Sequence, residues 1–155
     1  YWFRTSDNPF QPRALYLMAA YANDVSRSSG LHYCPLESEI AATKAGGWPA
    51  DKLLSELDGA IMALDAPRST ALAHAYLQSG ADRQRYLSTV ALAACRFQDD
   101  PHNQKITHST FEEYQHNSTH RRDRLLLAGV RLLAGWTKMP GERECFARFE
   151  TDYKN

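Results

Sequence analysis

The chain of 155 residues is 43% hydrophobic and 23% charged, the composition of a folded globular domain rather than of a disordered segment. Its 18 basic side chains balance 18 acidic ones, so no overall field favours nucleic acid or an anionic membrane surface. No apolar run approaches the roughly 20 residues that span a bilayer. These totals predict a protein with no nucleic-acid partner and no membrane span.

The three cysteines, Cys34, Cys95 and Cys145, form no C-x-x-C pair and no even framework. This pattern favours reduced thiols and a cytoplasmic location. The chain begins at Tyr1 without a methionine. We therefore expect residues 1–155 to be a single helical domain of a longer polypeptide, with other domains or subunits of that protein as its partners.

Apolar residues recur at helical spacing through most of the chain, and no stretch alternates as a strand. The regular helices are expected at about 12–25, 49–64, 67–79, 82–97, 101–116 and 120–136. Shorter helical segments are expected at about 36–44 and 141–153. The breaks between the middle helices are short, which favours antiparallel neighbours. The predicted fold is all-α, with six or seven helices in antiparallel hairpins and residues 120–136 at the centre.

Local signals set the helix boundaries. Asp82 is expected to be an N-cap, and Ser118 or Thr119 should cap the helix that follows the Asn117-Ser118-Thr119 break. The apolar positions expected to pack from the helix at 82–97 are Tyr86, Leu87, Val90, Leu92, Ala93 and Phe97. Those expected to be nearly fully buried in the helix at 120–136 are Leu126, Val130 and Leu133.

The stretch 96–124 holds four of the six histidines and offers a candidate metal site. Glu113 and His116 form a Glu-x-x-His pair, which carboxylate-bridged di-iron bundles use on each of two helices. The motif occurs once here, and such a pair also arises by chance. His108, Glu112 and His116 step by four and should share one helix face. If the helix ran through the break, His116 and His120 would resemble a helical zinc pair, although the protease order H-E-x-x-H is absent.

His74 and His102 are candidate cofactor ligands. His74 lies in the apolar run ALAHAYL, where it is either a structural core histidine or a metal or haem ligand. His102 follows Asp99-Asp100-Pro101, and it is either a loop residue or a ligand at a rigid helix start. The 14 steps from His102 to His116 span about 21 Å in a straight helix, so one ion cannot bind both.

Motifs typical of other catalytic chemistries are absent from the sequence. The sequence contains no Gly-rich phosphate loop, no G-x-S-x-G elbow and no cysteine in a recognisable nucleophile context. The sequence does not decide whether the protein is an enzyme.

The runs ALAHAYLQSG, LSTVALAACRFQDDPHNQ and RDRLLLAGVRLLAGW resemble a helical region of some bacterial multidomain proteins that also carry a Rieske-type [2Fe-2S] domain. The likeness covers roughly residues 50–150 and includes the Ala-His of His74 and the acidic segment before His102. The paired C-x-H and C-x-x-H ligands of the cluster itself are absent. The resemblance therefore implies a companion domain in a redox setting, with His74, His102 and His116 as candidate ligands.

Two functional hypotheses follow. The first is a helical module of a bacterial redox protein, with iron or haem at a histidine/carboxylate site. The second is a non-catalytic helical interaction or scaffold domain whose histidines are structural.

Overall fold

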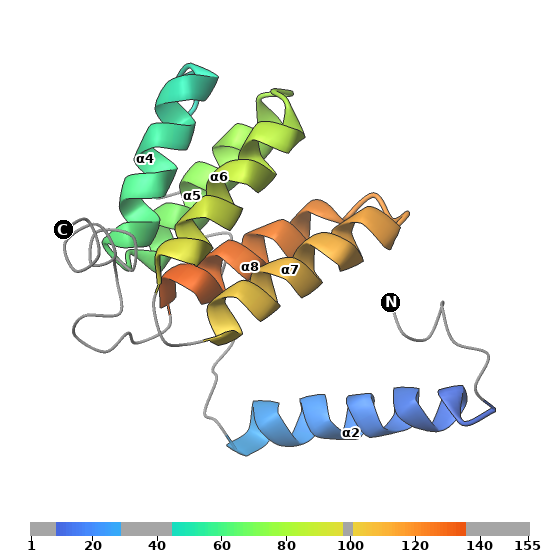
Figure 1. Ribbon diagram of the computed structural model, residues 1–155. Helices are drawn as coiled ribbons and strands as arrows, with labels where there is room; N and C mark the ends of the chain where they lie inside the picture. The colour runs from blue at the N-terminus through green and yellow to red at the C-terminus, as the bar shows by residue number, and fades with distance from the viewer. Residues whose placement is uncertain (1–8, 29–44, 98–100, 136–155) are drawn as a thin grey trace, which may run out of the picture. The chain divides into compact units, whose positions relative to one another are not determined.

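The computed structural model describes residues 9–28, 45–97 and 101–135 and divides the chain into two units, Tyr1–Pro35 and Leu36–Asn155. The first unit contains α2 (Gln11–Ser28). The second contains α4 (Ala50–Met62), α5 (Ala66–Gln78), α6 (Arg83–Arg96), α7 (Pro101–His116) and α8 (Asp123–Gly135). Every regular element in these ranges is a helix, which confirms the all-α prediction (Figure 1). The segments expected at 36–44 and 141–153 lie outside the described residues.

In the second unit, α4 and α5 form a hairpin, and α8 packs against both α5 and α7 (Figure 1). The central position of α8 is confirmed, because Leu126 and Val130 are each 1% exposed and Leu133 is 3% exposed. The largest fully buried side chains of the core are Tyr76, Tyr86 and Phe97. Among the residues described, no helix is long and apolar enough to cross a membrane.

The hairpin turns are held by local hydrogen bonds. Asp65 caps α5 by accepting a bond from the Arg68 amide at 3.1 Å. Asp82 caps α6 as expected, because its carboxylate accepts a bond from the Gln84 amide at 2.9 Å. Leu64 closes the α4–α5 turn with a φ of 58°, a left-handed conformation that a leucine rarely adopts. Its side chain packs against the core, which offsets the backbone strain.

The break between α7 and α8 is confirmed, but the predicted start of α8 is wrong. The helix begins at Asp123, not near His120, and residues 119–122 form turns. The side chain of Asn117 accepts a bond from the Thr119 amide at 2.8 Å, and the Arg122 amide donates to the Thr119 carbonyl. Asn117 therefore shapes this turn, in place of the predicted cap by Ser118 or Thr119.

The helices α7 and α8 approach closely where α8 has no side chain. A β-carbon added at Gly129 would lie 2.7 Å from Cγ2 of Thr110 and 3.0 Å from its Oγ1. Gly129 is buried in the middle of α8, where glycine is a poor helix former. The close approach of the two backbones explains why a glycine is found there.

Candidate functional site

The predicted metal residues lie on α7 and the turn that follows it. Glu113 is half-buried, while His116 and His120 are exposed. On the same helix, Nδ1 of His108 lies 3.5 Å from a carboxylate oxygen of Glu112. The four-residue spacing thus brings His108 and Glu112 together on one face. Two side chains supply fewer than the three protein ligands of a typical zinc site.

The predicted cofactor residues lie on two other elements. His74 is half-buried in α5, and His102 is exposed in the first turn of α7. His102 borders a cavity of about 10 Å³, together with Asn103 and Leu133 among others. A cavity of that size holds at most one water molecule and no haem. Within the described ranges, no three His, Cys, Asp or Glu side chains are placed to hold a metal ion.

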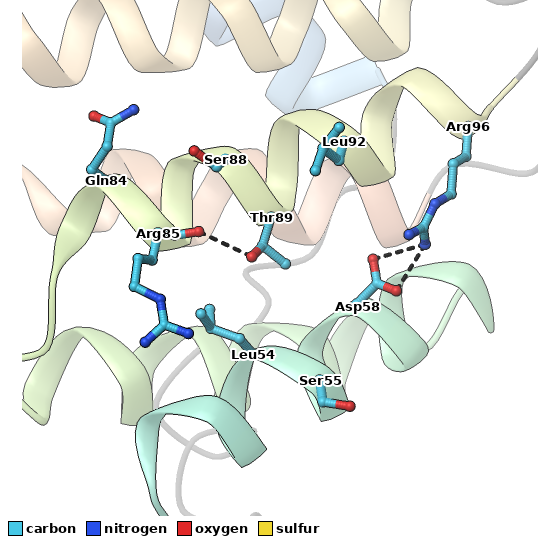
Figure 2. A pocket seen from close by; sticks show the side chains of 9 residues that line it. All are labelled: Leu54, Ser55, Asp58, Gln84, Arg85, Ser88, Thr89, Leu92 and Arg96. Atoms are coloured by element: carbon cyan, nitrogen blue, oxygen red, sulfur yellow. Dashed lines mark hydrogen bonds and ion pairs between the residues drawn. The ribbon is translucent and has the colours of Figure 1, made fainter.

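A larger concavity lies between α4 and α6, far from these histidines in sequence. We call it the α4–α6 groove; it is shallow and open to solvent, and its volume is about 480 Å³. Its lining comprises Leu54, Ser55 and Asp58 of α4 and Gln84, Arg85, Ser88, Thr89, Leu92 and Arg96 of α6. Figure 2 shows the two helices as opposite walls, with Arg85 reaching toward α4 and Arg96 meeting Asp58.

Two ion pairs cross from α6 to α4. Arg85 donates to Asp51 at 2.6 Å, and Arg96 donates to Asp58 at 2.8 and 2.9 Å. Each pair joins residues in the same order along both helices, so α4 and α6 run in the same direction. On α6 the two arginines are eleven steps apart, which is about 16 Å of helix. The two ion pairs thus join α4 and α6 at points about 16 Å apart along α6, and most of the groove residues lie between these points.

The two pairs differ in exposure. The side chains of Arg85 and Asp51 are 54% and 81% exposed, whereas those of Arg96 and Asp58 are 35% and 31% exposed. The hydrogen bond from Arg85 to Asp51 raises the pKa of the guanidinium, which stays cationic. Asp51 is not part of the groove lining, so the lining holds two arginines and one aspartate. Each of these arginines is nevertheless paired with one aspartate, so the formal charge of the four side chains together is zero.

Leu92 corrects one packing prediction. It was expected to pack with Tyr86 and Val90, but it is 61% exposed and lines the groove instead. The spacing explains the difference. Tyr86, Val90 and Ala93 step by four and three along the buried face of α6, and Leu92 falls off that series.

A second series on α6 could have indicated the groove from the sequence. Arg85, Thr89, Leu92 and Arg96 step by four, three and four, so they share one face. Nothing in the sequence, however, shows that α4 stands far enough from this face to leave a cavity.

The hydroxyl of Thr89 donates to the Arg85 carbonyl at 3.0 Å. The lining contains two serines and a threonine but no histidine, cysteine or lysine to activate them, and its one carboxylate, Asp58, is held by Arg96.

Comparison of the chain with protein-family models, with curated proteins and with solved structures gives no significant match. The resemblance to helical regions beside Rieske-type domains therefore stays a prediction, as does the iron or haem site at His74, His102, Glu113, His116 and His120.

Proposed function

We propose that this chain is a non-catalytic interaction module whose α4–α6 groove binds a helix of a partner protein. The observation that carries the proposal is Leu92. It is a large apolar side chain, 61% exposed, and it lines a concavity of about 480 Å³ whose other apolar lining residue is Leu54. A single exposed leucine on a convex surface would need no explanation. An exposed leucine in a groove offers a contact point for an apolar side chain of a partner.

The walls of the groove favour a helical partner over an extended one. Both walls are helices, whose backbone groups are already bonded within each helix. An extended segment would bring unpaired N–H and C=O groups to walls that have few backbone partners for them. A helix satisfies its own backbone and presents one row of side chains, as in known helix-in-groove recognition. Side chains from such a row would fill the groove while the partner backbone stayed outside.

Two measurements on the purified full chain test this function against the redox-module hypothesis. Metal analysis and visible absorption should show neither stoichiometric iron nor haem. A leucine-striped alanine–glutamine peptide of about 18 residues, long enough to form helix, should shift NMR signals of α4 and α6. Stoichiometric iron or haem, or peptide-induced shifts confined to α7 and α8, would contradict the proposal.

A further inference from the structure

We propose that Arg85 is an exchangeable anchor, and that the partner helix carries a carboxylate seven residues from the apolar side chain that contacts Leu92. This inference rests on the proposed function and adds the chemistry of the partner. Its basis is the unequal exposure of the two arginine–aspartate pairs that cross the groove.

The exposed pair can change partners at little cost. A solvent-exposed surface ion pair contributes little to stability, because water solvates each group almost as well as the opposing charge does. Asp51 is 81% exposed, so it stays hydrated when Arg85 turns to another carboxylate. Asp51 also lies outside the groove lining, whereas Arg85 lies within it. A carboxylate entering the groove therefore competes with Asp51, which lies 2.6 Å from Arg85, and it gains the guanidinium when Arg85 turns toward the groove.

The other arginine is held in place. Arg96 shares one guanidinium nitrogen between both oxygens of Asp58, at 2.9 and 2.8 Å. Both side chains are about two-thirds buried, so separating them would leave two poorly hydrated charges. Arg96 thus keeps its partner and forms one end of the groove, while Arg85 is the arginine whose partner can be replaced.

The spacing of the partner residues follows from α6. Arg85 and Leu92 are seven residues apart, which is about 10.5 Å along the helix axis and nearly two full turns. A partner helix lying along the groove repeats the same geometry. Its acidic side chain and its apolar side chain should therefore also be seven residues apart on one face. Binding excludes water from the new ion pair, which strengthens its Coulomb attraction while partly dehydrating both charges.

A charge exchange with three helical peptides tests this assignment. Each peptide carries leucine on one face and, seven residues away, glutamate, glutamine or lysine. Both sequence orders are made, because a helix can lie in either direction. Affinities are measured by fluorescence anisotropy for the full-length chain, for Arg85→Glu and for Arg121→Glu. Arg121 is exposed on the turn before α8 and lies outside the groove lining, so its variant controls for net charge.

The unmodified protein and Arg121→Glu should bind the glutamate peptide about 5- to 30-fold more tightly than the glutamine peptide, a preference that falls as salt is added. Arg85→Glu should reverse the order and prefer the lysine peptide. Circular dichroism confirms that each variant is folded. Equal affinity for the glutamate and glutamine peptides, or equal losses in both variants, would overturn the role of Arg85. If the glutamine peptide bound the groove as tightly as the glutamate peptide, helix binding by the groove would stand and the role of Arg85 would be contradicted. If no peptide bound, both helix binding and the role of Arg85 would be contradicted.

Discussion

One guanidinium nitrogen of Arg96 lies 2.9 and 2.8 Å from the two carboxylate oxygens of Asp58, and it joins α6 to α4 at one end of the groove. The second link between these helices, from Arg85 to Asp51, is a single hydrogen bond between more exposed side chains. The groove therefore has a more buried, doubly bonded link at one end and a more exposed, singly bonded link at the other.

This difference should appear in double-mutant cycles of stability. We expect the coupling energy between Arg96 and Asp58, measured by urea unfolding of Arg96→Gln, Asp58→Asn and the double variant, to be about 0.5–1 kcal/mol. The matched cycle for Arg85 and Asp51 should give a smaller coupling. An equal or larger coupling at Arg85 would show that its pair is not the exchangeable one.

Gly129→Ala should destabilise the protein by about 1–3 kcal/mol, because the new methyl group would overlap the stiff side chain of Thr110. Thermal or urea unfolding measures the loss. Thr110→Ala should restore part of it in the double variant, since it removes both γ atoms. Gly59→Ala is the matched control: its site on α4 is open, and alanine there should gain about 0.5–1 kcal/mol. A neutral effect at Gly129 would mean that α7 and α8 are less closely packed than described.

Leu126→Ala should cost about 2–5 kcal/mol of unfolding free energy, the usual range for a leucine truncated in a core. The side chain is 1% exposed and lies in the centre of the second unit. Leu132→Ala, six residues further along α8 and 42% exposed, should cost less than about 1 kcal/mol. Similar losses at the two sites would show that α8 does not present the face described here to the core.

Stability should fall above about pH 10, the ordinary pKa of tyrosine. Burial, with a smaller contribution from Asp123, raises the pKa of Tyr86 above that value, and burial also raises the pKa of Tyr76. The unfolded chain then loses protons that the folded chain retains. Each such tyrosine lowers the unfolding free energy by up to about 1.4 kcal/mol per pH unit above pH 10. Below pH 10 the tyrosine is protonated in both states, so it causes no change of stability with pH.

Tyr86→Phe provides the check on this pH dependence. It should reduce the slope between about pH 10 and pH 11.5 in urea unfolding, by up to about 1.4 kcal/mol per unit. At neutral pH it should cost about 0.5–1.5 kcal/mol, because the Tyr86 hydroxyl donates to the Leu126 carbonyl at 3.3 Å. An unchanged slope in the variant would show that Tyr86 ionises as readily folded as unfolded.

The sequence predicted the helices well because each boundary has a local chemical cause. Asp82 as an N-cap and Leu126 as a core residue both follow from short-range pattern and were confirmed. The start of α8 was misplaced because Asn117, a residue just as suited to turns as Ser118, forms the hydrogen bond there. Propensity alone does not rank such neighbours.

The groove was beyond the reach of the sequence because it depends on the separation of two helices. Leu92 has the same side chain as a core leucine, and only the placement of α4 shows that it faces an open concavity. The sequence instead predicted a site at the histidines, because residue type and spacing can be read directly from a sequence. Whether side chains from several helices converge is a property of the fold, and the described residues contain no metal-holding group of three.

The most direct test compares Leu92→Asp with Leu132→Asp for binding of the leucine-striped helical peptide by the full-length chain. Both substitutions place a carboxylate on an exposed helix surface, but only Leu92 lines the α4–α6 groove. We expect Leu92→Asp to weaken binding at least about tenfold, the change that 1.4 kcal/mol produces, and Leu132→Asp to leave it within about twofold. Equal affinities for the two variants would show that the groove is not where the peptide binds.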